Sequence, residues 1–324
     1  EAQRPPACVL TPESADWVPD LTVIERRSFP VTGQLWEQAV LPVRARGGVL
    51  VNLANLAPVA HRRKITMIHD AQFLFGDCGY PWRQRVGYRW LAPLIGRTSR
   101  TVLTVSDFSR RMLDTFAIAD AAKVRVIHNG ADHITEAAEN PALRQRLGLV
   151  PNGYAVIFGS PKRYKNVETA FAAFADGALA PLQLVVVGPD RAAHEAVGIH
   201  PPADAIFAGR PDDGELRGLL AGALVTLFPS RTEGFGLPPL EAMLCGCPVI
   251  AAPAGAIPEA CGNAALYAGT DSPAEWRAAI EALRDDPVLR GRMIAQGYRR
   301  ASGFTWSRAG AELMETILDV ARQD

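Results

Sequence analysis

Two carboxylates stand on either side of a glycine-containing turn in the second half of the chain. In the stretch SRTEGFGLPPLEAM (230–243), Glu233 comes before Gly-Phe-Gly and Glu241 comes after Pro238 and Pro239. The two prolines suit the first turn of a helix, where backbone N–H groups have no intrahelical partner. Bare amides of the glycine turn and the positive end of a helix both attract anions. The stretch therefore predicts a phosphate site bordered by acids, with Glu241 in the first helical turn.

A simpler interpretation is that acids near a helix N-terminus complement the helix dipole, which is worth about 0.3–1 kcal/mol. For Glu241 alone both interpretations stay open. The pair favours a ligand, because a molecule with phosphates and hydroxyls needs amide donors for the former and carboxylate acceptors for the latter. Sugar nucleotides carry both groups.

A basic turn forms the second candidate element. In FGSPKRYKN (158–166), Lys162, Arg163 and Lys165 crowd the turn before a predicted helix. Such a turn is either a solvated basic loop or a diphosphate site, where a lysine gives charge-assisted hydrogen bonds of roughly 1.5–3 kcal/mol. The second interpretation is favoured, since strand–loop–helix units of one domain direct their loops to a shared crevice.

Short β-branched runs alternate with helical stretches, which is the pattern of parallel sheets covered by helices. The predicted strands are 48–54, 64–70, 100–106, 123–129, 154–160, 182–188, 205–209, 224–230 and 247–253. Helices are expected at 107–116, 166–176, 213–223 and 273–285. The fold class is α/β, with two doubly wound domains.

The domain limits follow from the turn residues Gly148, Pro151 and Gly153 between periodic segments. We expect an N-terminal domain over 1–148, a C-terminal domain over 149–304 and a terminal amphipathic helix over 305–324. This helix is expected to pack back toward the first domain.

Composition sets limits on partners and compartment. The chain has 34 basic and 34 acidic side chains, and this balance argues against a nucleic-acid footprint. Five cysteines, an odd number, favour a reducing compartment. The Cys245-Gly-Cys247 pair has no second Cys/His pair at ligand spacing, so no metal site is expected. With no signal peptide and no long apolar run, the expected location is the cytoplasm or the inner face of a membrane.

The motifs resemble one known family. The stretches PSRTEGFGLPPLEAMLCGCPVIAAPAGAIPEACGNAALY, GSPKRYKNVETAFAAF, VIHNGAD, TVSDFSRRML and MIHDAQF are similar to those of the retaining glycosyltransferases of family 4, the glycosyl transferases group 1, including mannosyltransferase-like members. The resemblance covers roughly residues 40 to 320. It implies the GT-B fold, with two Rossmann-like domains facing a central cleft.

The resemblance also assigns roles. It implies that Glu241 binds ribose hydroxyls, that Glu233 contacts the donor sugar together with the amides of Gly234, Phe235, Gly236 and Leu237, and that Lys165 holds the diphosphate. His69, at the end of KITMIHD, matches a family position near the transferred sugar. A histidine at a strand end otherwise has a structural role more often than a catalytic one.

Two departures from the family pattern matter. Ser160 follows Gly159 where many members have arginine, so Lys162 or Arg163 must supply the second cation or it is absent. The family's opening strand and glycine-rich acceptor loop cannot be found before residue 40. Ser106, Asn129 and Gly130 also follow strands. Asn-Gly is a common turn, and of these residues only Asn129 and Gly130 are further candidates for lining the cleft.

The predicted reaction moves a hexose, with mannose favoured, from a nucleoside diphosphate sugar to a hydroxyl of a saccharide or lipid-linked saccharide during bacterial polysaccharide synthesis. GDP-mannose is the favoured donor, UDP- and dTDP-sugars are alternatives, and neither a metal nor another cofactor is expected. Glu233 either attacks as a nucleophile or binds sugar hydroxyls, and the second role is favoured. Alternatives are a catalytically silent GT-B partner subunit and, less well supported, a glycoside hydrolase.

One further stretch combines arginines with aromatic residues. YPWRQRVGYRWLAPLIGRTSR (80–100) carries five arginines among Trp82, Tyr88, Trp90 and Leu91. It predicts either a peripheral membrane contact through 82–100 or an ordinary helix with a core stripe and solvated arginines.

Overall fold

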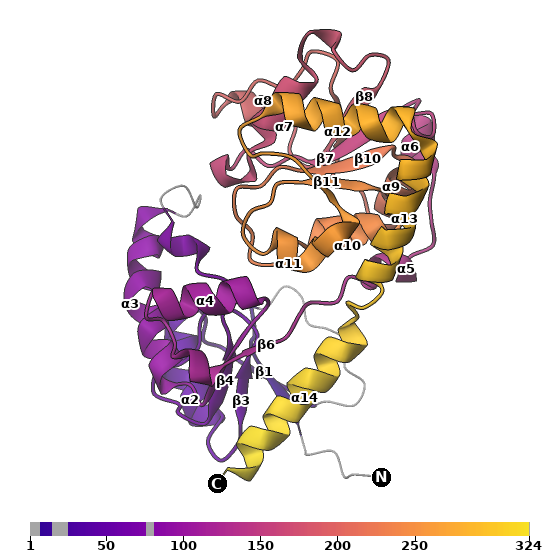
Figure 1. Ribbon diagram of the computed structural model, residues 1–324. Coiled ribbons are helices and arrows are strands. Elements are labelled where there is room, and N and C mark those ends of the chain that lie inside the picture. The colour runs from indigo at the N-terminus through magenta and orange to yellow at the C-terminus, as the bar shows by residue number, and fades with distance from the viewer. Residues whose placement is uncertain (1–6, 15–24, 76–80, 324) are drawn as a thin grey trace.

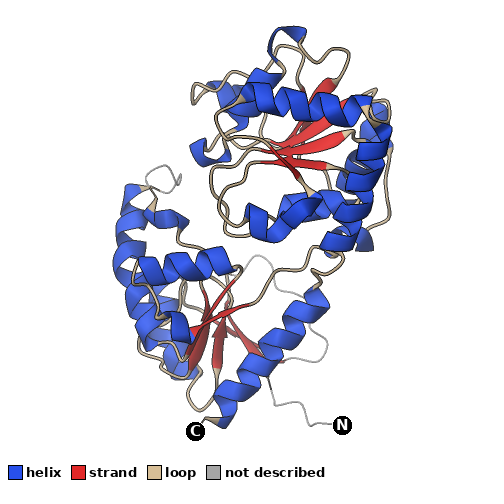
Figure 2. Cartoon of the chain, in the orientation of Figure 1, coloured by secondary structure: helices blue, strands red, loops and turns tan. Residues whose placement is uncertain are grey.

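The computed structural model of the chain describes residues 7–14, 25–75 and 81–323. Its two larger parallel sheets are each covered by helices and form a lower and an upper half, joined near β6 and α5 (Figure 1). Each of these sheets, together with the helices that cover it, forms one α/β half of the molecule (Figure 2).

The first sheet has four parallel strands in the order β3-β4-β5-β6. They are β3 (Leu50–Asn52), β4 (Lys64–Met67), β5 (Thr101–Thr104) and β6 (Val124–Val126). The helices of this half are α1 (Gly33–Leu35), α2 (Leu41–Arg44), α3 (Trp82–Thr98) and α4 (Asp107–Thr115). A π-helical turn (Trp36–Val40) joins α1 to α2, and a 3-10 turn η2 (Gln72–Leu74) follows β4.

The second sheet has six parallel strands in the order β12-β11-β10-β7-β8-β9. They are β7 (Tyr154–Phe158), β8 (Gln183–Val187), β9 (Ile206–Gly209), β10 (Val225–Phe228), β11 (Val249–Ala251) and β12 (Leu266–Tyr267). Its helices are α5 (His133–Glu136), α6 (Ala142–Arg146), α7 (Val167–Ala173), α8 (Arg191–Glu195), α9 (Asp213–Gly222), α10 (Leu237–Leu244), α11 (Ile257–Cys261), α12 (Pro273–Asp285) and α13 (Pro287–Ala301). The central strands β7 and β10 are almost fully buried and, apart from Thr226 of β10, apolar, because helices cover both faces of the sheet.

The strand order of the second sheet reverses between β7 and β10. From β7 the chain first proceeds through β8 to β9 on one side, and β10 then returns to the other side of β7. In open parallel sheets such a reversal leaves a crevice beyond the carboxyl ends of the two strands, where ligands bind. The loops that follow β7 and β10 are the ones that carry Lys165 and Glu233.

All nine strands expected from the sequence form, each within the expected range but shorter. Three strands were not predicted. They are the edge strand β12 and the strands β1 (Cys8–Pro12) and β2 (Glu25–Phe29), which form a separate parallel pair. The segment ERRSF of β2 has three charged residues and is mostly exposed, so it lacks the apolar run that marks a buried strand. The sequence-based domain limits at 148 and 304 stay a prediction.

The terminal helix α14 (Trp306–Arg322) runs along the first half (Figure 1). Arg125 of β6 forms an ion pair with Asp319 at 2.8 Å, and Arg63 donates to the carbonyl of Ala321 at 3.1 Å. Gly130 lies against the start of this helix, where a Cβ would come within 2.2 Å of the Trp306 nitrogen. Gly130, a candidate for the cleft, therefore serves close packing. Among the described helices, none has the length and apolarity needed to cross a bilayer.

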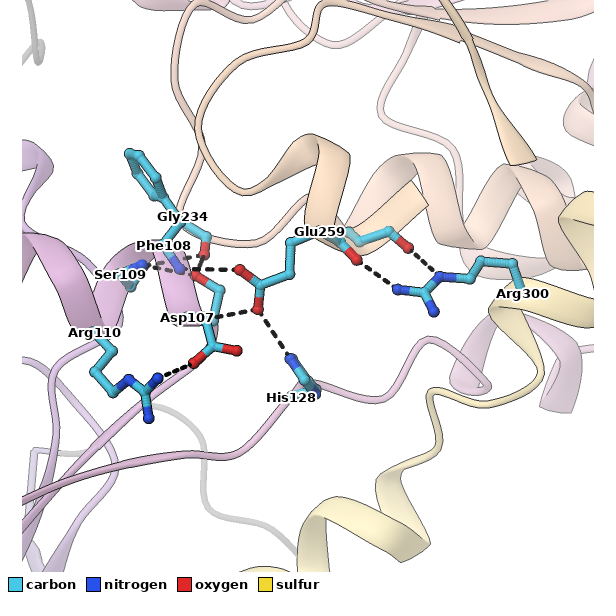
Figure 3. Close-up of polar contacts among 10 residues, drawn as sticks. Asp107, Phe108, Ser109, Arg110, His128, Gly234, Glu259 and Arg300 are labelled. Atoms are coloured by element: carbon cyan, nitrogen blue, oxygen red, sulfur yellow. Dashed lines mark hydrogen bonds and ion pairs between the residues drawn. The ribbon is translucent and has the colours of Figure 1, made fainter. Parts of the chain in front are cut away.

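One carboxylate links the two halves directly (Figure 3). Glu259 of α11 accepts hydrogen bonds from the amides of Asp107 and Phe108, at 2.7 and 2.9 Å, in the first turn of α4. His128 lies 3.2 Å from the same carboxylate. Burial alone raises the pKa of Glu259, but the hydrogen bonds from His128 and from the two amides outweigh it and hold the pKa below its usual value. Glu259 thus acts as an N-terminal cap supplied by the opposite half.

Replacing Glu259 by glutamine should destabilise the protein by about 1–3 kcal/mol, because the amides of α4 lose a charged acceptor. Since the folded-state pKa is lowered, the stabilisation is present above the ordinary glutamate pKa and disappears as the pH falls through the folded-state value. Urea unfolding of both proteins at neutral and acidic pH measures this. An equal difference in stability at both pH values would contradict the assignment.

Candidate active site

Two loops meet beyond the carboxyl ends of β7 and β10. Lys165 ends the 3-10 turn η4 (Arg163–Lys165), and its Nζ lies 2.7 Å from Oε1 of Glu233 in the loop after β10. The two side chains are only 23% and 13% exposed. The structure therefore brings the basic turn and the acidic turn to one crevice at the reversal point of the sheet.

Asn166 fixes the basic turn against its neighbours. It is buried and adopts a left-handed conformation with φ 54°, which asparagine tolerates better than most residues. Its Nδ2 donates to the carbonyls of Pro229, at 3.1 Å, and Thr270, at 2.7 Å. The Arg231 amide adds a 2.8 Å bond to the Tyr164 carbonyl. These bonds hold Lys165 at the start of the Glu233 loop.

The glycine turn is oriented by the opposite half of the molecule. Ser106 Oγ and Ser109 Oγ donate to the carbonyl of Gly234, at 2.6 and 3.1 Å. The Gly234 C=O and the Phe235 N–H belong to one trans peptide group and point in opposite directions, so the Phe235 N–H points away from these serines. Within the described residues, the amides of Gly234, Phe235 and Gly236 donate no hydrogen bond. Three adjacent donors are thus left for a ligand.

The residues around this turn divide between ligand and core roles. Gly236 is the N-cap of α10 with φ 108°, a conformation that favours glycine. Pro238 and Pro239 follow Leu237 and carry no N–H, so the free amides lie in the turn itself. The Phe235 ring is 5% exposed and packs between the rings of His128 and Phe304, at 5.8 and 5.7 Å. Only the backbone of Phe235 is placed to meet a ligand.

Glu241 lies deeper than the sequence indicated. It is the fifth residue of α10 and not in the first turn, which contains no acid. The prediction of a first-turn position is wrong because the helix begins at Leu237 and the two prolines fill its start. Glu241 is 8% exposed, and its Oε1 lies 2.9 Å from Nε2 of His133 in α5. Burial raises the pKa of Glu241, while His133 opposes the shift.

His133 was not identified from the sequence. It follows Asp132 in the segment that joins the halves, and no strand end or motif marks it. The Glu241 carboxylate on α10 and the His133 imidazole on α5 give the site a polar end. Glu241 lies about 6 Å along α10 from Leu237, at 1.5 Å per residue.

The remaining residues of the basic turn are open to solvent. Lys162 and Arg163 are exposed, and Lys162 lies over the Tyr164 ring at 6.0 Å. Ser160 is half-buried at the start of the turn. Of the three cations, Lys165 alone contacts the acidic loop in the described structure. A second diphosphate cation from Lys162 or Arg163 stays a prediction.

His69 follows β4 on the opposite side of the crevice. Its Nε2 lies 3.1 Å from the carbonyl of Leu53, and its amide donates to Oδ1 of Asn55 at 2.9 Å. A carbonyl can only accept, so this contact assigns the proton to Nε2 and leaves Nδ1 of the neutral ring as an acceptor.

Asp70, beside His69, is a residue whose importance the sequence did not reveal. A Cβ at Gly234 would lie 2.9 Å from the Asp70 Cβ, so these two chain segments approach closely and position 234 must be glycine. Burial chiefly raises the pKa of Asp70, and the charge of Glu233 adds to the rise, whereas the Gln72 amide, His69 and Lys165 oppose it. Asp70, Glu233 and Lys165 therefore form one charge cluster drawn from both halves.

Other residues near the crevice have structural roles or no assigned contact. Ser106 caps α4 by accepting from the Ser109 amide, in addition to its bond to Gly234. Asn129 is half-buried near the junction of the halves. Burial raises the pKa of Cys247 to about 12, and its Sγ lies 3.2 Å from Oγ1 of Thr226. In the described part of the chain, no three His, Cys, Asp or Glu side chains gather as a metal site would require.

Comparison with known proteins identifies the family. Residues 139–300, half of the chain, match the model described as Glycosyl transferases group 1. The chain is 31% identical over 261 residues to O-antigen chain mannosyltransferase B of Escherichia coli, covering 75% of this chain and 67% of that protein. The chain therefore belongs to the glycosyl transferases group 1 family, as its motifs indicated.

Other similarities concern length and fold. A D-inositol 3-phosphate glycosyltransferase of Acidothermus cellulolyticus is 28% identical over 285 residues, covering 82% of this chain and 62% of the relative. The chain thus spans about 62% of the length of that protein. The structure of Anabaena Alr3699/HepE in complex with UDP and glucose superposes with a TM-score of 0.71 at 21% identity, covering 91% of this chain and 86% of the other. The fold is GT-B, and the prediction of this fold is confirmed.

Replacing Asp70 by asparagine should stabilise the protein at neutral pH, because the pKa of this carboxyl is raised on folding and its charge is therefore unfavourable in the folded state. The free energy of unfolding of the wild-type protein falls, relative to that of the variant, as the pH rises from the ordinary aspartate pKa through the folded-state pKa of Asp70. The melting temperatures of both proteins should consequently differ at neutral pH and converge in acid. A variant less stable than the wild type at neutral pH would show that the carboxylate is instead a net stabilising partner of Lys165.

Proposed function

We propose that the chain is a retaining hexosyltransferase that moves a sugar, with mannose favoured, from a nucleoside diphosphate to a hydroxyl of a saccharide or lipid-linked saccharide. The observation that carries this proposal is the Lys165–Glu233 pair beside three amides without partners at the reversal point of the second sheet. A cation and free amides suit a diphosphate, and the neighbouring carboxylate suits sugar hydroxyls.

In the proposed reaction, the bond between the anomeric carbon and the diphosphate oxygen breaks, and its electron pair leaves with the diphosphate. The anomeric carbon acquires oxocarbenium character. The acceptor oxygen then bonds to this carbon from the leaving-group face, and its proton passes to a departing phosphate oxygen. Lys165 and the amides of residues 234–236 would stabilise the charge on the leaving group. This arrangement calls for no metal ion.

Glu233 is better suited to hold the sugar than to attack it. In the absence of ligand one of its oxygens accepts a hydrogen bond from Lys165. When a diphosphate takes over the lysine, the carboxylate is free to accept from sugar hydroxyls. His69 Nδ1 supplies another acceptor from the opposite side. Glu241, paired with His133, would bind the ribose.

The preference for mannose rests on the similarity to the Escherichia coli mannosyltransferase, which also supports a role in polysaccharide synthesis. GDP-mannose is accordingly the favoured donor. The Anabaena structure contains UDP and glucose, so UDP-sugars are the main alternative, followed by dTDP-sugars. Catalysis would take place in the cytoplasm or at the inner face of the membrane.

A thermal-shift panel of GDP-, UDP- and dTDP-sugars tests the donor. A ligand at 100 times its dissociation constant stabilises the folded state by about 2.7 kcal/mol, and GDP-mannose should give the largest shift. Lys165→Ala and Glu241→Ala should each abolish the shift. Lys123→Ala and Glu315→Ala, which remove exposed side chains far from the crevice in sequence, serve as matched controls and should retain it. Full binding by both site variants would refute the site.

Lys165→Ala should also reduce kcat/KM for the donor at least about 10²–10³-fold, since it removes a preorganised charge from the leaving group. Release of sugar from the identified donor, with or without an acceptor, provides the assay. A donor that binds but is never turned over, with any acceptor class, would favour the silent partner subunit instead.

A further inference from the structure

Helix α3 presents a row of large apolar side chains to solvent. Trp82, Val86, Trp90 and Leu94 follow one another at intervals of four residues and are 69%, 47%, 75% and 47% exposed. Residues four apart share one face of a helix, so the four side chains form a continuous stripe. Figure 1 shows α3 at the outer edge of the first half, on the side opposite α14. Apolar surface gathered in this way marks an interaction site.

The opposite face of α3 forms the contact with the core. Ala92, Ile95 and Gly96 are buried, and the Tyr88 ring stacks on Phe73 with ring centroids 5.0 Å apart. The sequence had grouped Tyr88 and Leu91 with the exposed tryptophans. The structure corrects this grouping, because these two side chains are less exposed and Val86 and Leu94 take their places. The stripe is therefore separate from the face of α3 that packs against the core.

Positive charge surrounds the stripe. Arg83, Arg89 and Arg97 are exposed on the same helix, and Arg83 lies 5.5 Å from the Trp82 ring centroid. The sequence from 78 to 106 contains five arginines and neither aspartate nor glutamate. A surface of this kind complements a negatively charged partner that also accepts apolar side chains.

We propose that the exposed face of α3 docks on a bilayer containing anionic lipids. Tryptophan side chains favour the boundary between lipid headgroups and acyl chains, and arginines gain from the negative surface potential. An interfacial helix with an apolar stripe and flanking cations has both properties. A protein partner would need an acidic groove matched to this stripe, whereas a bilayer satisfies the pattern without further fitting.

The core-facing side of α3 packs on the segment that follows His69 and Asp70 in the chain. A cavity of about 260 Å³ is lined by Arg89 and Pro93 of α3 together with Phe73, Leu74, Phe116 and Ile118. Phe73 and Leu74 belong to η2, which begins two residues after Asp70. A membrane held at the outer face of α3 would therefore lie about one helix diameter, roughly 10–12 Å, from the segment that carries His69 and Asp70, within reach of a lipid-linked acceptor. This last step rests on the proposed function, and the docking itself does not.

Co-sedimentation of the full chain with vesicles tests the docking. We expect binding to phosphatidylcholine vesicles that contain phosphatidylglycerol and much weaker binding to phosphatidylcholine alone. Arg83→Gln combined with Arg97→Gln should weaken binding to the anionic vesicles by roughly 25-fold, at about fivefold for each arginine. Added salt should reduce binding of the wild type more than that of this variant.

Trp82→Ala combined with Trp90→Ala should abolish binding, while Tyr298→Ala, which removes an aromatic side chain that is 57% exposed on α13, should bind as the wild type does. These side chains are exposed, so unchanged melting temperatures will confirm folding. Equal sedimentation with and without anionic lipid, or full binding by the double tryptophan variant, would overturn the proposal. Because vesicle binding needs no donor, its failure is separable from failure of the proposed transfer, which the nucleotide panel measures.

Discussion

The contact between Lys165 and Glu233 depends on one topological constraint, the reversal of strand order between β7 and β10. Only at this point do two loops leave adjacent parallel strands toward opposite sides of the sheet and leave room between them. At this point Lys165 Nζ and Glu233 Oε1 form an ion pair at 2.7 Å. In the absence of ligand the pair neutralises both charges, and a diphosphate that takes over the lysine would release the carboxylate for the sugar.

The first half completes the site. Serines at the start of α4 hold the Gly234 carbonyl, Glu259 returns a cap to the same helix, and Asp70 approaches Gly234 closely enough to exclude any side chain there. The position of α4 thus determines both how the halves meet and where the Phe235 amide points. Side chains at the interface between the halves therefore also set the direction of the amide donors.

Local patterns in the sequence were sufficient to predict the fold and part of the candidate site. Each of the nine predicted strands forms, because buried parallel strands are mostly apolar and short runs of β-branched residues identify them. Lys165 and Glu233 could be paired in advance, since each follows a strand of the same sheet. The exposed strand β2 carries no such run, and its charged residues gave no indication of pairing.

Residues that act through distant contacts could not be predicted in this way. His133 meets Glu241, and Glu259 meets α4, only because the two halves come together, and no spacing along the chain encodes these meetings. How deeply Glu241 is buried depends on where α10 begins. Which face of α3 is exposed depends on which face packs against the core.

A crystal structure of the chain with an intact nucleoside diphosphate sugar tests the role of the Lys165–Glu233 pair most directly. We expect the diphosphate to lie within hydrogen-bond distance of Lys165 Nζ and the Phe235 amide, with Glu233 turned to the sugar. A diphosphate bound elsewhere, with the Lys165–Glu233 contact unchanged, would contradict it.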